Sequence, residues 1–179
     1  MNAIETHALT RRFGAHTAVD GLDLTVRQGE LFALLGVNGA GKTTTLRMLS
    51  GLLQPTGGEA DILGFRLTQQ PQEIKRRINL SPQETAVAPN LTVRENLELI
   101  AGIYGASRRE AAQRAAETIA EFHLGEVERS RAKTLSGGWQ RRLSIAMALI
   151  SQPQLVFLDE PTLGLDVLAR RELWQVIRS

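Results

Sequence analysis

Two short apolar runs constrain the fold of this chain more than any other feature. Leu31–Leu35 lies between Gly29 and Gly36, and Leu155–Leu158 is followed directly by Asp159. Short, unbroken apolar runs without polar alternation are typical of strands that are buried on both faces. Because helical sequence separates the two runs, the pattern predicts an α/β fold built on a parallel sheet.

Other segments add an antiparallel strand and a helical insertion to this core. Leu22, Leu24 and Val26 alternate with polar residues, which predicts an N-terminal strand with one wet face. Thr92–Glu95 and Ser107–Glu110 both fit a capping box followed by apolar residues at helical spacing. The sequence therefore predicts helices over roughly residues 84–134, inserted between the two buried strands.

Composition limits the classes of protein that this chain can belong to. It has 179 residues, 42% of them hydrophobic, which is typical of one globular domain. It has no cysteine, which excludes disulfides, Cys-ligated zinc and thiol nucleophiles. No apolar run reaches the roughly 18 residues of a transmembrane helix, so any membrane association is expected to be peripheral. The net charge of +2 does not indicate a nucleic-acid partner, and the basic clusters Lys75–Arg77 and Arg141–Arg142 are interpreted as solvated helix faces.

A glycine-rich loop follows the first apolar run and precedes a predicted helix. Its sequence, Gly36–Thr43, fits G-x-x-x-x-G-K-[ST], in which backbone N–H groups and a helix N-terminus form a cradle for phosphate. Lys42 supplies a charge for the β- and γ-phosphates, Thr43 a hydroxyl for Mg²⁺, and Thr44 a second phosphate contact. The alternative is a glycine-rich turn with an incidental lysine. The residues assigned to the nucleotide are Gly36, Asn38, Gly39, Ala40, Gly41, Lys42, Thr43 and Thr44.

Two carboxylates follow the second apolar run. Asp159 comes at the end of the strand, where a parallel sheet delivers side chains to a ligand crevice, and it is assigned to Mg²⁺. The adjacent Glu160 is assigned to the water that attacks the γ-phosphate. An Asp-Glu pair can also be a solvated strand end, but the phosphate loop in the same chain favours the catalytic interpretation.

Three further motifs occur in a fixed order near the end of the chain. Leu135–Gly138 opens a helix, Leu158–Thr162 follows, and Gly164–Asp166 comes next. In this order the chain resembles the nucleotide-binding domain of ATP-binding cassette (ABC) transporters from residue 1 to its last residue. The resemblance implies a P-loop NTPase core with a mostly parallel sheet, N-terminal antiparallel strands and an inserted α-helical subdomain. It divides the single domain 1–179 into a RecA-like core, 1–83 and 135–179, and a helical subdomain, 84–134.

The resemblance also implies roles for residues outside the phosphate loop. Gln83 matches the glutamine that reaches Mg²⁺ and the attacking water and couples to the membrane partner, and Phe13 takes the place of the aromatic residue that stacks on adenine. Ser136, Gly137 and Gly138 match the signature motif, which contacts ATP held by the opposite subunit. The implied assembly is a head-to-tail homodimer, or a pairing with a second ABC domain, in which Asp166 lines the seam.

Two features depart from the family pattern. Trp139 stands where the family usually has Gln or Met, and it is expected to be a tolerated side chain that packs at the dimer seam. Family members also place a switch histidine after the helix that here corresponds to Val167–Ser179, where the chain stops. His7, His16 and His123 are expected to be surface or turn residues. The chain is therefore interpreted as an ABC domain that is C-terminally truncated before the switch histidine.

The resemblance implies an ATP-binding and ATP-hydrolysing subunit that uses Mg²⁺ and powers a membrane ABC transporter. The sequences of its motifs are most like those of bacterial drug and polysaccharide exporters, so export is expected. Such a subunit is a peripheral protein on the cytoplasmic face of the membrane, bound to a transmembrane permease. Two alternatives remain, namely a soluble ABC ATPase of translation or DNA metabolism and an ATP-binding fragment without turnover. The presence of one cassette, and of only about 50 residues between Gln83 and Leu135, favours the transporter, with no nucleic acid as partner.

Overall fold

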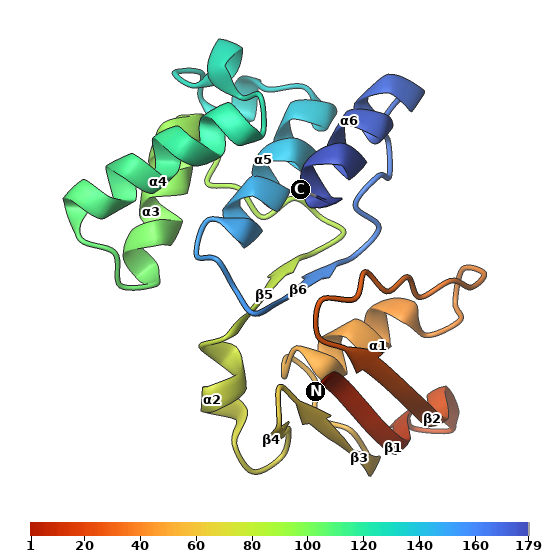
Figure 1. The fold of residues 1–179 in the computed structure, drawn as a ribbon. Helices are drawn as coiled ribbons and strands as arrows, with labels where there is room; N and C mark the ends of the chain where they lie inside the picture. The colour runs from red at the N-terminus through yellow and green to blue at the C-terminus, as the bar shows by residue number, and fades with distance from the viewer. Residues whose placement is uncertain (179) are drawn as a thin grey trace. The chain divides into compact units, whose positions relative to one another are not determined.

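The computed structural model describes residues 1–178, apart from the side chains of Leu168, Glu172 and Arg178. The chain forms two compact units, one of residues 1–78 and one that begins at Asn79 (Figure 1).

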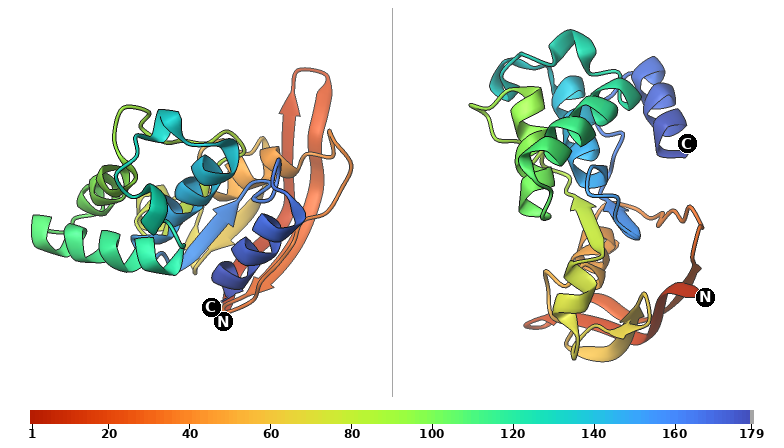
Figure 2. Two further views of the ribbon diagram at one scale, coloured as in Figure 1. Left: turned by 90° about the horizontal axis from the view of Figure 1, so that it is seen from above. Right: turned by 60° about the vertical axis from the view of Figure 1, so that its left-hand side comes forward.

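The first unit contains a four-stranded antiparallel sheet. Its strands are β1 (Asn2–Phe13), β2 (His16–Arg27), β3 (Gly57–Ile62) and β4 (Phe65–Arg66), in the order β2-β1-β3-β4. Figure 2 shows β1 and β2 as one long hairpin, in which Ile4 lies opposite Val26. The N-terminal antiparallel strand predicted from Leu22–Val26 is therefore confirmed.

Two helices complete the first unit, α1 (Lys42–Leu49) and α2 (Pro71–Lys75). Met48 and Leu49 form the buried apolar side of α1. Helix α1 ends in a glycine cap, because Gly51 takes a left-handed φ of 70° and its N–H donates to the Met48 carbonyl at 2.9 Å.

The prediction of a buried strand at Leu31–Leu35 is wrong. Residues 30–37 form no strand, and Leu31 and Leu35 are 55% and 88% exposed. A strand buried on both faces needs pairing partners and a covering layer. The four strands of this unit pair antiparallel with one another, and none of them offers the apolar run a parallel partner.

The second unit contains a short parallel pair, β5 (Ile78–Ser81), whose first residue is the last residue of the first unit, and β6 (Leu155–Leu158). The strand predicted at Leu155–Leu158 is therefore confirmed, although only Phe157 within it is fully buried. The Asp159 N–H donates to the Ser81 carbonyl at 3.0 Å, so the backbone ladder continues to the last residue of β5.

Helices make up most of the second unit. Thr92 caps α3 (Val93–Ile103) and Ser107 caps α4 (Arg108–Glu121), each with the reciprocal glutamate bond that the sequence predicts. Short 3-10 turns η1 (Gly125–Val127) and η2 (Ala132–Thr134) lead to α5 (Gly137–Leu149), and α6 (Val167–Arg178) follows β6. In the part of the chain that the structure describes, no helix has the length and apolarity needed to span a bilayer.

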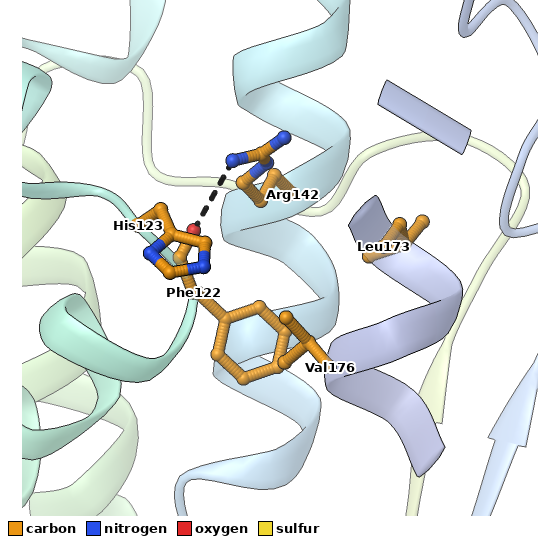
Figure 3. Close-up of a pocket in the computed structure, with 5 residues that line it drawn as sticks. All are labelled: Phe122, His123, Arg142, Leu173 and Val176. Atoms are coloured by element: carbon orange, nitrogen blue, oxygen red, sulfur yellow. Dashed lines mark hydrogen bonds between the residues drawn. The ribbon is translucent and has the colours of Figure 1, made fainter. Parts of the chain in front are cut away.

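Helix α5 lies at the centre of the apolar core of this unit. It is buried on nearly every side, including Leu143, Ile145 and Ala146. Leu173 and Val176 of α6 line a small recess with Phe122, and the Arg142 guanidinium donates to the Phe122 carbonyl at 3.4 Å (Figure 3). The helix predicted from Val167 is confirmed up to Arg178, and Ser179 lies outside the described residues.

Candidate functional site

The glycine-rich loop of the first unit is an exposed turn that runs into α1. The Ala40 N–H donates to the Val37 carbonyl at 3.1 Å, and both Gly39 and Gly41 have left-handed φ values, 85° and 81°. Gly41 is the N-cap residue of α1 and has no side chain with which to cap the helix, and the first turn carries no acid. The start of this helix is therefore suited to an external anion.

The Lys42 side chain folds back onto the glycine-rich loop. Its Nζ donates to the carbonyls of Gly36 at 2.8 Å and Val37 at 2.9 Å, so the amine lies over the same backbone that the sequence assigns to phosphate. The Thr43 and Thr44 side chains follow within the first turn of the helix, and both are partly buried. One positive charge, a helix N-terminus and neighbouring hydroxyls form a donor set that fits nucleotide phosphates.

Phe13 lies at the end of β1, opposite His16, and 47% of it is exposed. One face of its ring is occupied, because the Arg11 guanidinium carbon lies 4.5 Å from the ring centroid. Arg11 is held there by a bond from Nη1 to the Gln54 carbonyl at 2.8 Å. The cation and the exposed ring form a π platform that can take an aromatic base.

The second unit holds Gln83, Asp159 and Glu160. Gln83 is exposed and follows β5, whereas Asp159 is buried at 6% exposure directly after β6. Glu160 has a left-handed φ of 47°, a conformation that costs a non-glycine residue ~1–2 kcal/mol. The strand ends thus deliver these residues to one edge of the β5–β6 pair, and the backbone at Glu160 is held in an uncommon conformation.

Arg141 is a residue of this region that the sequence did not predict. Its interpretation as part of a solvated helix face is wrong, because it is 3% exposed and bonds to the backbone around Gln83 and Asp159. The sequence signal that could have found it is the apolar run that follows, Leu143–Ile150, which indicates a helix that is buried over most of its surface. Its neighbour Arg142 is half-buried and bonds elsewhere.

The signature residues form the start of α5. The Ser136 hydroxyl caps this helix and accepts from the Trp139 N–H at 3.5 Å, and Gly137 begins the helix. A Cβ on Gly138 would lie 3.5 Å from Leu165, which places the signature turn beside the segment that carries Asp166. Asp166 itself caps α6 by accepting from the Ala169 N–H at 2.9 Å.

The remaining sequence predictions concern Trp139 and the histidines. Trp139 packs against the core of its unit, with the Arg142 guanidinium carbon 5.1 Å from its ring centroid. His7, His16 and His123 are all exposed, as expected. The structure therefore brings Gln83 and Asp159 together through Arg141 in one unit, and joins Lys42 to the glycine loop in the other.

Comparison with known proteins decides the family. The family described as "ABC transporter" matches residues 19–163, which is most of the chain. The chain belongs to the ABC transporter family. The structure of this ABC chain is also similar to that of a dimeric ATP-binding cassette bound to ADP and Pi in a post-hydrolysis state. The TM-score is 0.87 at 28% identity, and the match covers 97% of this chain and 81% of that chain. The α/β fold class predicted from the sequence is therefore confirmed.

The names of two relatives of this ABC chain refer to drug resistance and to Nod factor export. It is 45% identical over 177 residues to the daunorubicin/doxorubicin resistance ATP-binding protein DrrA of Streptomyces peucetius, covering 99% of this chain and 54% of the relative. It is 39% identical over 176 residues to the Nod factor export ATP-binding protein I of Cupriavidus metallidurans, covering 98% of this chain and 58% of the relative. The chain thus spans about half the length of these relatives.

Proposed function

We propose that this chain is the ATP-binding and ATP-hydrolysing part of a subunit that powers an ABC exporter. The observation that carries the proposal is the Lys42 amine, which lies across the Gly36 and Val37 carbonyls at the start of α1. The names of the relatives, which refer to drug resistance and to Nod factor export, support export as the direction of transport.

In the proposed site, Lys42 binds the β- and γ-phosphates, and the backbone of Gly36–Thr44 turns its N–H groups toward the phosphate oxygens. Phe13 stacks on adenine with its exposed face, since Arg11 occupies the other face. These residues bind and orient the nucleotide, which is the larger part of catalysing phosphoryl transfer.

Hard oxygen donors support Mg²⁺ as the metal. Thr43 offers a hydroxyl, Gln83 an amide oxygen and Asp159 a carboxylate, and oxygens of these kinds suit Mg²⁺ in phosphate sites. When bound, Mg²⁺ neutralises charge on the β- and γ-phosphates. Glu160 accepts a hydrogen bond from the attacking water and orients it, and Gln83 contacts the same water.

The proposal extends to the partners of the chain. Ser136, Gly137 and Gly138 bind the γ-phosphate held by a second ABC domain, in a head-to-tail homodimer or a paired subunit. The dimeric state of the similar cassette bound to ADP and Pi supports this arrangement. Residues 84–134 form the helical subdomain that, with Gln83, contacts a transmembrane permease, so the protein lies on the cytoplasmic face of the membrane as a peripheral subunit.

The test uses the full-length protein assembled with its membrane partner. Lys42→Met is expected to lose ATP binding, and Glu160→Gln is expected to bind ATP but lose turnover, on the order of 10²-fold or more. Lys75→Met is the matched control, because Lys75 is an exposed lysine at the end of α2. Normal ATP hydrolysis by Glu160→Gln contradicts the role of Glu160. ATP binding without turnover by the unmodified assembly selects a nucleotide-binding module instead, and salt-dependent binding to DNA or ribosomes selects a soluble ABC ATPase.

A further inference from the structure

Arg141 is a buried cation in the centre of the second unit. It lies in α5, five positions after the helix-capping Ser136, and only 3% of it is exposed. A buried guanidinium is costly unless its donors are satisfied and its charge is balanced. The groups that satisfy it therefore indicate what it does.

The Arg141 guanidinium donates to backbone carbonyls of two separate loops. Nη1 donates to Pro82 at 2.5 Å and to Gln83 at 3.2 Å, in the loop after β5. Nη2 donates to Asp159 and Nε donates to Pro161 at 3.2 Å, in the loop after β6. The planar fork of arginine can join two loops in this way, whereas the compact ammonium of lysine cannot reproduce its geometry.

The two carbonyls that Arg141 binds after β6 flank Glu160. Glu160 is the residue with a left-handed φ of 47°, and Asp159 and Pro161 are its direct neighbours. The Asp159 carbonyl belongs to the peptide group that directly precedes Glu160, and the Pro161 carbonyl to the second peptide group after it. Fixing the backbone at these two points opposes relaxation of Glu160 to a more favourable φ. Arg141 is thus placed to hold the uncommon backbone conformation from which the Glu160 side chain projects.

The charge of Arg141 is balanced from the same loop. Burial lowers the pKa of Arg141, and the carboxylates of Asp159 and Glu160 act in the opposite direction. An arginine stays protonated at neutral pH even when its pKa is lowered. The positive charge therefore attracts the two carboxylates while the hydrogen bonds fix the backbone that carries them.

We propose that Arg141 is a positioning residue for ATP hydrolysis, which fixes the Gln83 backbone and the Glu160 backbone relative to each other and to the signature end of α5. The inference rests on the proposed function. Because Ser136–Gly138 and Arg141 belong to one helical segment of about one and a half turns, a displacement at the signature end is transmitted to both loops. Arg141 thereby links engagement of the signature motif to the orientation of the attacking water.

Kinetics distinguishes positioning from a merely structural role. Phe13 and Gly36–Thr44, which are assigned to ATP, belong to the first compact unit, whereas Arg141 fixes two loops of the second. Because Ser136–Gly138, Gln83 and Asp159 of the second unit are also assigned to the nucleotide and its metal, a positioning role is expected to lower kcat much more than it changes the KM for ATP. A structural role instead lowers the folded fraction, and with it the number of ATP-binding sites per chain.

The experiment compares Arg141→Gln and Arg141→Lys with the control Arg142→Gln in the full-length protein assembled with its membrane partner. Arg142 is the adjacent arginine on the same helix, and its guanidinium contacts the Phe122 carbonyl and the Trp139 ring instead. Arg141→Gln is expected to lower kcat on the order of 10²-fold, because misplacement of a reacting group by about 1 Å has an effect of that size. Arg141→Lys is expected to be intermediate, and Arg142→Gln to keep the kcat of the unmodified protein.

A double-mutant cycle gives a second readout. In a Glu160→Gln background, Arg141→Gln is expected to cause little further loss of turnover, because the residue that it positions is already disabled. A full additional loss in that background overturns the proposal, as does normal kcat in Arg141→Gln beside an active unmodified protein. If Arg141→Gln does not fold, the comparison rests on Arg141→Lys, for which normal kcat likewise overturns the proposal. Absence of hydrolysis by the unmodified assembly overturns the proposed function itself.

Discussion

Gly41 approaches the backbone of Ala18 so closely that a Cβ on Gly41 would lie 2.3 Å from the Ala18 carbonyl oxygen. The glycine-rich loop therefore packs directly against strand β2. Two constraints meet at this glycine, because its φ of 81° is also left-handed. Its role in the loop is therefore set by packing as well as by backbone conformation.

Gly41→Ala is expected to destabilise the protein by more than the ~1–2 kcal/mol that a left-handed alanine costs, because β2 or the loop must also move. Gly39→Ala is the matched control, since Gly39 has a φ of 85° but a Cβ added there would have nothing within 4 Å. Urea unfolding of the full-length variants measures both losses. Equal losses for the two variants contradict a steric role for the Ala18 carbonyl.

Local signals in the sequence predicted local structure well. The two capping boxes, the start of α1 after Gly41 and the start of α5 after Ser136 all depend on residues within one helical turn, and all are confirmed. Bonds of this kind form without help from distant parts of the chain. The candidate site residues near helix starts could therefore be assigned to elements from the sequence alone.

Features that depend on distant partners were not predictable in this way. Leu31–Leu35 has the composition of a central strand but no strand pairs with it among the described residues, so the apolar run by itself does not determine its structure. Arg141 was missed because its partners lie 18 to 59 positions away in the sequence. The pairing register of β1 shifts near Ala8, whose φ is 47°. This irregularity interrupts the alternation of inward and outward side chains, and the sequence of β1 therefore shows no clear period-two pattern.

The capping box of α3 predicts a dependence of stability on pH. The Thr92 N–H and hydroxyl donate to Glu95 at 2.7 and 2.9 Å, and these bonds lower the pKa of Glu95. A glutamate with a lowered pKa in the folded state stabilises the protein above its ordinary pKa of ~4.3 and loses that contribution as pH falls through the lowered value. The stability difference between the unmodified protein and Glu95→Gln, measured by urea unfolding at a series of pH values, is therefore expected to shrink over that acid range.

The cap itself is tested at neutral pH. Thr92→Ala is expected to lower the free energy of unfolding by about 1 kcal/mol, because the Glu95 N–H loses the side-chain acceptor that lies 3.2 Å away. Thr92→Ser keeps that acceptor and is the control, with stability close to that of the unmodified protein. Chemical denaturation measures both variants, and equal destabilisation by alanine and serine contradicts the capping role.

Trp139 is expected to be tolerated in the signature segment. Its ring packs against the core and lies beneath the Arg142 guanidinium, so Trp139→Gln is expected to lose ~0.5–1 kcal/mol of stability from this contact and to keep its ATPase rate. In an Arg142→Gln background, which lacks the Arg142–Trp139 contact, Trp139→Gln is expected to lower the free energy of unfolding by less. A large gain in ATPase rate on Trp139→Gln would instead identify the tryptophan as a defect of the signature motif.

Phe13 and Phe65 provide a matched pair of rings in the first unit. Each lies 4.5 Å from an arginine guanidinium, Arg11 in one case and Arg77 in the other, but only Phe13 is assigned to adenine. Phe13→Ala is expected to weaken ATP binding about tenfold to hundredfold, because stacking on a base contributes ~1–3 kcal/mol. Phe13→Tyr retains a π face and is expected to retain the affinity.

Phe65→Ala removes an equivalent cation–π contact that is not assigned to the nucleotide, so it is expected to leave ATP affinity unchanged. Fluorescence titration with an ATP analogue measures the dissociation constant for all three variants. Equal weakening by Phe13→Ala and Phe65→Ala would mean that loss of the Arg–Phe contact, rather than loss of a stacking surface, lowers the affinity. We expect Phe13→Ala alone to weaken ATP binding and Phe13→Tyr to keep the affinity. The reason is that only the exposed face of the Phe13 ring, opposite Arg11, is assigned to a base.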